Sequence, residues 1–227
     1  MEYKNIQVGE FISRPNRFIA HVKIENTIEI CHVKNTGRCK ELLLPGATVY
    51  VQHFPNTKRK TSWDLIAVKK GDVLINIDSQ APNKAVKEWL LSGGLGFIPD
   101  IVKPEFQYED SRFDFYLERD NKRWLIEVKG VTLEKDRVAL FPDAPTLRGV
   151  KHIEGLARHA KEGFETAILF VIQMDGILYF SPNETMHPEF AQALRQAKQA
   201  GVNVLAYDCE VTPDSMKIRN PIKVRLE

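Results

Sequence analysis

The stretch that most constrains the fold is residues 111–130, SRFDFYLERDNKRWLIEVKG, which alternates apolar and polar side chains over both of its halves. A period of two residues is the spacing of a β-strand, in which successive side chains point to opposite faces. The alternation places Phe113, Phe115 and Leu117 on one face of the first strand, toward a core. The polar residues of that strand then lie on the other face, where they need polar partners.

A tight turn at Asp120 and Asn121 joins the two predicted strands, because both residue types tolerate the positive φ that a two-residue hairpin loop requires. This register sets Asp114 directly opposite Glu127. Directly opposed residues have Cβ atoms roughly 4.5–5.5 Å apart, and two carboxylates at that separation repel each other. The sequence therefore predicts a cation between them.

The chemistry of these residues favours a particular class of cation and reaction. Two carboxylates with no Cys or His adjacent in the sequence are hard oxygen ligands that suit Mg²⁺ or Mn²⁺. Lys129 lies on the same face as Glu127, where its ammonium can orient a water or stabilise charge on a phosphate. Such a set suits metal-assisted phosphodiester hydrolysis. The alternative is a solvated sheet face on which Arg112 and Lys129 only neutralise the two acids.

The chain divides into two parts of different character near residue 80. Residues 1–80 contain a run of short strands separated by turns, which is typical of a small closed barrel such as the OB-fold. The strands are expected at 17–24, 27–33, 47–54, 63–70 and 73–77. Residues 81–227 mix strands with helices, which predicts an α/β domain. The helices are expected near 83–92, 146–162 and 188–200.

Charge makes the first part the better candidate for a polyanion surface. The whole chain carries a net charge of only +2, but residues 1–80 hold 12 Lys and Arg against 8 Asp and Glu. Loops between barrel strands carry nucleic-acid contacts in OB-folds. The candidates in such loops are Arg38, Lys40, Lys58, Arg59 and Lys60. A loop that serves solubility alone is the alternative.

Several motifs resemble a known family in sequence and in order. They are NTGRC (35–39), LPG (44–46), SRFDF (111–115), IEVKGVTL (126–133), FPDAPTLRGVKH (141–152) and GVNVLAY (201–207). The chain resembles the sugar fermentation stimulation protein family, SfsA, and its D-x12-E-x-K pattern is similar to that of PD-(D/E)XK nucleases. The resemblance implies an N-terminal OB-fold barrel over residues 1–80, followed by a PD-(D/E)XK nuclease-like α/β domain over 81–227. It also implies DNA binding without sequence preference and a link to the regulation of sugar fermentation.

The resemblance also assigns roles to individual residues. It makes Asp114 and Glu127 metal ligands and Lys129 the catalytic lysine. Some nucleases of this superfamily recruit a carboxylate from a helix, which makes Glu88 a third candidate ligand; an exposed helix glutamate is the alternative. The superfamily's proline before the first acid is absent here, where Phe113 stands.

The helix expected at 146–162 begins with basic residues that could contact phosphates. Arg148, Lys151 and His152 lie in its first turns, and an Arg can hold a phosphate through two hydrogen bonds. A basic start is mildly unfavourable to the helix dipole, which favours a functional purpose over a merely solvated one. Asp143 and Thr146 are expected to cap this helix.

These observations leave three functional hypotheses. The first is a DNA-binding protein with an Mg²⁺- or Mn²⁺-dependent phosphodiesterase or endonuclease site. The second is a DNA-binding transcriptional regulator that keeps the nuclease fold without catalysis, and the third is a protein-interaction module. Three cysteines without a CxxC pair, no leader-like N-terminus and a longest apolar run of only 167–172 predict a cytoplasmic protein with no membrane segment.

Overall fold

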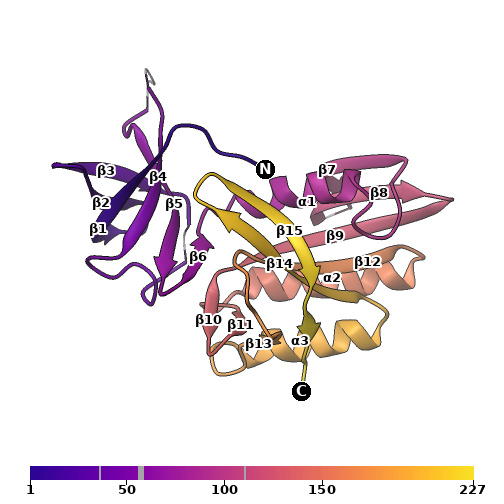
Figure 1. The fold of residues 1–227 in the computed structure, drawn as a ribbon. Helices are drawn as coiled ribbons and strands as arrows, with labels where there is room; N and C mark the ends of the chain where they lie inside the picture. Colours follow the sequence, from indigo (N-terminus) through magenta and orange to yellow (C-terminus); the bar gives the residue numbers. More distant parts are fainter. Residues whose placement is uncertain (36, 56–58, 110) are drawn as a thin grey trace.

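The computed structural model describes residues 1–35, 37–55, 59–109 and 111–227, and it places an N-terminal barrel beside an α/β domain (Figure 1). The strands of the barrel part are β1 (Ile6–Asn16), β2 (Ile19–Ile24), β3 (Thr27–Val33), β4 (Thr48–His53), β5 (Trp63–Lys70) and β6 (Val73–Asn76). They follow the order β3-β2-β1-β4-β5-β6, and a parallel pairing of β3 with β5 closes the circuit. The predicted barrel is therefore confirmed.

The barrel closes through a strand that the sequence did not indicate. β1 contains Gly9 and Pro15 and lacks a clean alternation, so its pattern does not predict a strand. Gly9 is required there, because a Cβ at this position would lie 2.5 Å from a side-chain carbon of Val22 on β2. The expected strand at 73–77 is β6, which extends the sheet from β5 and takes no part in the closure.

The α/β domain is built on a mixed sheet of order β15-β14-β12-β9-β8-β7. Its central strands β9, β12 and β14 run parallel, while β7, β8 and β15 pair antiparallel at the edges. The bounds are β7 (Ile101–Tyr108), β8 (Ser111–Arg119), β9 (Lys122–Val131), β12 (Glu165–Ile172), β14 (Asn203–Thr212) and β15 (Ser215–Pro221). A small second sheet contains β10 (Leu133–Lys135), β11 (Val138–Phe141), β13 (Tyr179–Pro182) and β16 (Lys223–Val224).

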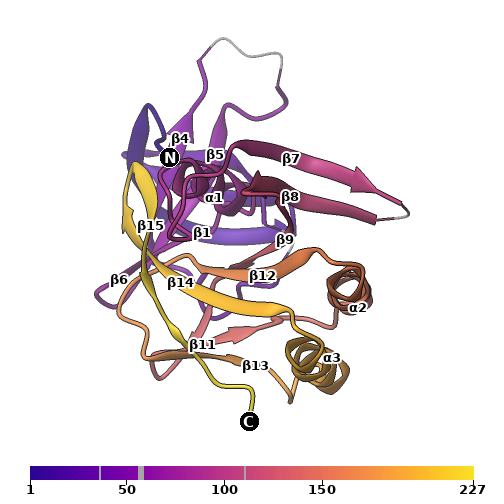
Figure 2. The same cartoon turned by 90° about the vertical axis from the view of Figure 1, so that its right-hand side faces the viewer.

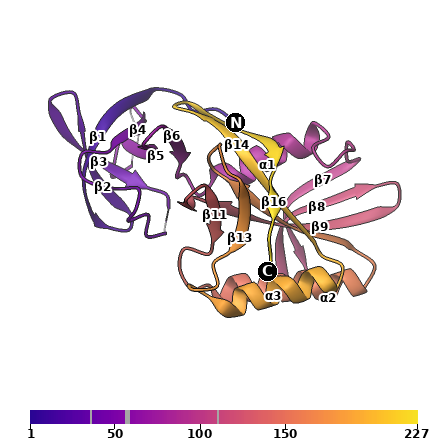
Figure 3. The same ribbon diagram turned by 60° about the horizontal axis from the view of Figure 1, so that its bottom comes forward.

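Helices cover both faces of the large sheet, as Figures 2 and 3 show. Helix α1 (Ala81–Leu91) packs its buried Ala85 and Leu90 against one face, in the same core as Phe115. Helices α2 (Leu147–Lys161) and α3 (Pro188–Gln199) cover the other face, where Leu156 joins the core. Side chains that emerge from the two faces of one strand can therefore meet partners from different helices. Within the described residues, no helix has the length and apolarity needed to cross a membrane.

The predicted alternation along the first strand of the hairpin fails at one point. Phe115 and Leu117 lie in the core beneath α1, but Phe113 lies on the opposite side, with its ring centroid 5.5 Å from that of His159 on α2. The expectation that all three share a face is therefore wrong for Phe113. The irregularity falls at Asp114, between the two phenylalanines.

Polar contacts join the barrel to the α/β domain. Lys34, at the end of β3, lies 2.7 Å from Asp78 Oδ2 and 3.4 Å from Asp64 Oδ2, and both carboxylates are buried. Gln173, which follows β12, donates from Nε2 to the backbone oxygens of Asn76 and Asp78. The chain crosses between the two parts through residues 76–81, beside the sequence boundary expected between residues 80 and 81. Residues 1–3 are an exception, because they pack on α1 and β15 of the second domain.

Lys34→Ala is expected to lower the free energy of unfolding by about 3 kcal/mol, because it removes the cation that pairs with the buried Asp78 and leaves the buried Asp64 with Arg59 alone of the two cationic side chains. Urea denaturation followed by circular dichroism measures the change. Lys122→Ala is the matched control: its ion pair with Glu165 is exposed, so its loss is expected to cost less than about 1 kcal/mol. Equal effects of the two substitutions would contradict the importance given to the buried network.

Candidate active site

The hairpin of β8 and β9 forms as predicted, and it has the predicted register from the turn to Phe115 and Ile126, but the expected pairing of Asp114 with Glu127 is not part of the ladder. Asp120 and Asn121 have φ angles of 49° and 63°, and Phe115 pairs with Ile126. The cross-strand ladder from the turn ends at that pair. Beyond it, the Asp114 carboxylate replaces the backbone pairing, because its Oδ2 accepts a hydrogen bond from Val128 N at 2.7 Å.

Asp114 is held from two directions. Asn83, in the first turn of α1, donates from Nδ2 to Asp114 Oδ1 at 2.8 Å, while β9 supplies the backbone donor to the other oxygen. Burial, and then the nearby charge of Glu127, raise the pKa of Asp114 in spite of these hydrogen bonds. The two carboxylates thus repel each other as the sequence predicts.

Glu127 is 3% exposed and is stabilised as an anion. Its Oε1 accepts a hydrogen bond from Lys129 Nζ at 2.6 Å and also contacts His152 Nδ1. Burial alone would raise the pKa of Glu127, but the contacts with His152 and Lys129 outweigh it and lower the pKa. Arg148 Nε donates to His152 Nε2 at 3.2 Å, and the other ring nitrogen of His152, Nδ1, faces Glu127.

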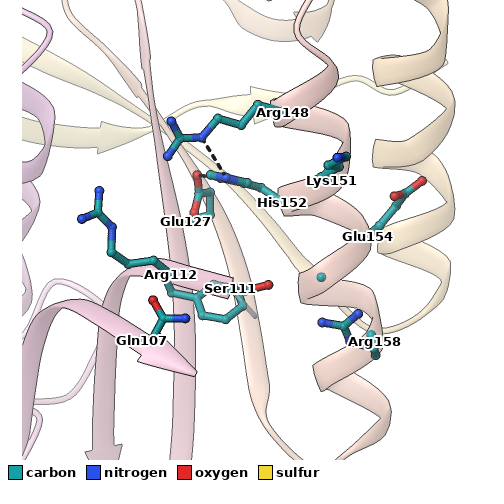
Figure 4. Close-up of a pocket in the computed structure, with 11 residues that line it drawn as sticks. Gln107, Ser111, Arg112, Glu127, Arg148, Lys151, His152, Glu154 and Arg158 are labelled. Carbon is teal, nitrogen blue, oxygen red and sulfur yellow. Dashed lines mark hydrogen bonds and ion pairs between the residues drawn. The ribbon is translucent and has the colours of Figure 1, made fainter. Parts of the chain in front are cut away.

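These side chains line connected hollows between the hairpin and α2. A cavity of about 250 Å³ brings Asp114, Glu127 and Lys129 together with Ser79 and Asn83. A larger one of about 670 Å³ shares Glu127 and His152 and continues along α2 (Figure 4). The three residues expected to perform the chemistry therefore border one site.

The donors at this site fit a hard divalent cation. Asp114 and Glu127 are the residues that would hold it, since both border the smaller cavity and their mutual repulsion is relieved by positive charge between them. Both contacts of Glu127 use Oε1, and Oε2 has no hydrogen-bond partner among the described residues. Carboxylate oxygens and a polar amide suit Mg²⁺ or Mn²⁺ better than a soft metal.

Glu88 is not brought to this site. Its side chain is exposed and pairs with the amino terminus of Met1 at 2.6 Å, in a separate hollow beside Trp89. The α1 residue that reaches the site is Asn83, five positions earlier and about 140° away around the helix. No local pattern marks Asn83, because a short polar residue in a first helical turn is common. The expectation of a third carboxylate ligand from Glu88 thus has no support in the geometry.

The basic start of α2 does face the site, but its members differ in role. Arg148 and His152 reach over Glu127, whereas Lys151 borders only the larger cavity. Thr146 caps the helix by accepting a hydrogen bond from Gly149 N at 3.0 Å, as expected. Asp143 does not cap it; its Oδ2 accepts from the backbone N of Arg38, so it joins the barrel to the α/β domain.

The barrel candidates separate into two groups. Arg38 and Lys40 are exposed and border a hollow of about 320 Å³ that also contains Arg14 and Arg17. Arg14 donates to the backbone oxygens of Asn35, Gly37 and Arg38, which fixes the loop that carries Arg38.

In the loop between β4 and β5, Arg59 pairs with the buried Asp64 and lies over the ring of Phe54, so it is anchored to the barrel. Lys60 is exposed, and Lys58 lies outside the described residues.

A second carboxylate and histidine group lies at the opposite end of α2. Possible ligand atoms of Glu109, His159 and Glu162 all lie within 4.8 Å of one another. His159 is buried and its Nδ1 lies 2.7 Å from Glu162 Oε2. The side-chain contact between His159 and Glu162 accounts for their proximity, and both glutamates are exposed to solvent.

Comparison with known proteins places the chain in a family. A model described as the sugar fermentation stimulation protein RE domain matches residues 80–215, and one described as the SfsA N-terminal OB domain matches residues 12–77. The chain belongs to the SfsA family. The predicted order of an OB-fold barrel followed by a nuclease-like α/β domain is thereby confirmed.

Relatives of this SfsA-family chain match it over its whole length. The sugar fermentation stimulation protein homologues of Ruminiclostridium cellulolyticum and Clostridium beijerinckii are 56% and 54% identical to it, with 100% of each chain covered. The solved structure of Pyrococcus furiosus SfsA in complex with Ca²⁺ is similar with a TM-score of 0.89 and 28% identity, over 99% of this chain and 98% of that one.

The two carboxylates should affect stability in opposite directions in the metal-free protein. The raised pKa of Asp114 means that its stabilising contribution is present at acid pH and is lost as the pH rises through the folded-state value. Asp114→Asn is therefore expected to be more stable than the wild type at neutral pH, by a margin that shrinks toward acid pH.

Glu127→Gln is the matched comparison, and it is expected to be less stable than the wild type at neutral pH. The lowered pKa of Glu127 gives stability that is present at neutral pH and is lost as the pH falls through the folded-state value. Thermal unfolding in EDTA over a pH series measures both variants. Destabilisation by both substitutions at neutral pH would contradict the asymmetry.

Proposed function

We propose that this SfsA-family protein binds DNA without sequence preference and hydrolyses phosphodiester bonds with Mg²⁺ or Mn²⁺ as an endonuclease. The proposal is carried by one observation: Asp114, Glu127 and Lys129 border the same cavity, with Lys129 Nζ 2.6 Å from Glu127. Two carboxylates that repel each other beside a lysine have little structural value but suit a metal-dependent hydrolase.

Each residue of the site has a definable task in this reaction. A bound divalent cation would supply Lewis acidity and a lowered pKa for an attacking water. Asn83 and the Val128 amide fix the orientation of Asp114, and His152 fixes that of Glu127. Lys129 orients the water or stabilises the negative charge that develops on the phosphate. Arg148 lies at the rim, where it can hold a phosphate oxygen.

A related structure supports the cation. Pyrococcus furiosus SfsA was solved in complex with Ca²⁺, which takes oxygen ligands as Mg²⁺ and Mn²⁺ do. Ca²⁺ binding by a relative agrees with a hard-ligand site, and the same class of cation is proposed for this chain.

The DNA surface is proposed to continue onto the barrel. Arg14, Arg17, Arg38 and Lys40 gather around one hollow, and the Arg38 backbone contacts Asp143, which lies shortly before α2. Lys60 is proposed as a further contact from the loop between β4 and β5. Contacts of this kind bind the phosphate backbone and carry no sequence information.

Lys129→Ala is expected to lower Mg²⁺- or Mn²⁺-dependent nicking of supercoiled plasmid by at least about 100-fold, because it removes the group that stabilises charge in the transition state. DNA affinity, measured in the same buffer with Ca²⁺, is expected to stay within about twofold, since a single phosphate contact contributes modestly. Lys122→Ala, at the far end of the same strand, is the control and should nick as the wild type does.

A wild-type protein that shifts DNA at low salt and nicks under no divalent metal would favour the regulator without catalysis. Metal binding can be followed separately, by the increase in melting temperature that Mn²⁺ produces. That increase should disappear in Asp114→Asn. Protein with no salt-dependent DNA affinity would point instead to an interaction module.

The double variant Arg38→Ala and Lys40→Ala is expected to bind DNA more weakly and with a shallower dependence on salt. Each lost phosphate contact lowers the slope of log K against log salt by about 0.9. Fluorescence anisotropy across a salt series measures the slope. The exposed pair Lys84 and Lys87 on α1 gives a control of equal charge, and an equal change in slope for both doubles would exclude the barrel hollow as a specific contact surface.

A further inference from the structure

Gly155 occupies a position in α2 that packing does not explain. It is the ninth of fifteen residues of this helix, where a glycine is destabilising relative to alanine. Among the described residues, a Cβ at Gly155 would meet only Ser111 Oγ, at 3.7 Å, which is ordinary contact. Gly149 of the same helix differs, because a Cβ there would crowd Thr146 and the ring of Phe190. Contacts among the described residues therefore do not require the lack of a side chain at the buried Gly155.

The space that Gly155 leaves belongs to the larger cavity. This hollow of about 670 Å³ begins at Glu127 and runs between the β7–β8 hairpin and α2, with Gly155 and Ser111 in its lining. A side chain larger than alanine at position 155 would project into it. The cavity is thus a groove that reaches Glu127 of the proposed catalytic pair and has no side chain at its middle position, Gly155.

The charged lining of this groove suits a polyanion. Its basic side chains come from both walls: Arg112 from the hairpin, and Arg148, Lys151 and Arg158 from α2. From Arg148 to Arg158 the helix rises about 15 Å, which is long enough to follow a few successive phosphates of one strand. Among the lining residues that the structure describes, Glu127 and Glu154 carry the opposing charge. Glu127 is the proposed metal ligand, and Figure 4 shows the Glu154 carboxylate on the side of α2 away from Arg112 and Glu127.

We propose that this groove binds a single DNA strand adjacent to the bond that is cleaved, so that the substrate is single-stranded or locally opened DNA. The volume lies in the range that holds a small ligand, which gives room for a few nucleotides of one strand but not for a duplex. The Gly155 position allows the strand to lie against the helix backbone, and Arg158 holds a phosphate at the distal end. This inference rests on the proposed function for the identity of the cleaved bond, but the groove can be tested by binding alone.

Gly155→Leu and Arg158→Gln test the groove in EDTA, where no cleavage occurs. Fluorescence anisotropy with a labelled oligodeoxythymidine and with a duplex of equal length gives the affinities. We expect the wild type to prefer the single strand and Gly155→Leu to weaken that binding by about tenfold or more, the effect of losing one well-placed nucleotide. Arg158→Gln should weaken it less and lower the salt dependence by the equivalent of one contact.

Lys122→Gln is the control for charge and should bind the single strand as the wild type does. Gly155→Ala serves only as the melting-temperature reference for a side chain at this position of the helix. If Gly155→Leu melts at a lower temperature than Gly155→Ala, Arg158→Gln decides the question. Unchanged single-strand affinity in Arg158→Gln and in folded Gly155→Leu would overturn the groove assignment. If the wild type binds the single strand in the groove but does not nick DNA, only the proposed hydrolysis is contradicted.

Discussion

The repulsion between the carboxylates of Asp114 and Glu127 is the constraint around which the α/β domain is arranged. Neither charge is tolerated in a low-dielectric interior without its own donors. Asp114 takes them from α1 and from the β9 backbone, whereas Glu127 takes them from α2 and from Lys129. The donors thus come from helices on both faces of the sheet. A two-layer fold with helices on one face alone would leave one of the two acids without half of its partners.

The barrel is attached close to this site. Asp78 and Ser79 lie in the crossing segment just before α1; Asp78 pairs with Lys34 of the barrel, and Ser79 both donates to the Lys34 backbone and borders the smaller cavity. Four residues later, Asn83 reaches Asp114. The barrel contacts of Asp78 and Ser79 therefore lie only a few residues along the chain from the side chain that orients Asp114.

Patterns among residues close together in the chain predicted the hairpin register and the helix cap, because these features depend on neighbouring residues. Alternation and a turn with positive φ were sufficient for the register of β8 and β9, and Thr146 was recognisable as a cap. Contacts that depend on tertiary packing could not be predicted in this way. Asn83 reaches the site in place of the expected Glu88 because of where α1 lies. Phe113 changes face next to Asp114, whose carboxylate accepts the hydrogen bond from Val128 N. β1 was not predicted because Gly9 and Pro15 interrupt its alternation of apolar and polar residues, although the barrel closes through this strand.

Helix α2 contributes one face to the hydrophobic core and another face to the candidate site. Its inner face places Ile153 and Leu156 in the core, and Gly149 leaves room for the ring of Phe190 on α3. The face toward the hairpin bears Arg148, His152, Gly155 and Arg158, which recur at intervals of three and four residues and so form one stripe along the helix. Hydrophobic periodicity alone identifies the first face. The second face is recognised only when Gly155 is counted together with the polar residues of the stripe. The absence of a side chain there helps to form the groove, as the charged side chains do.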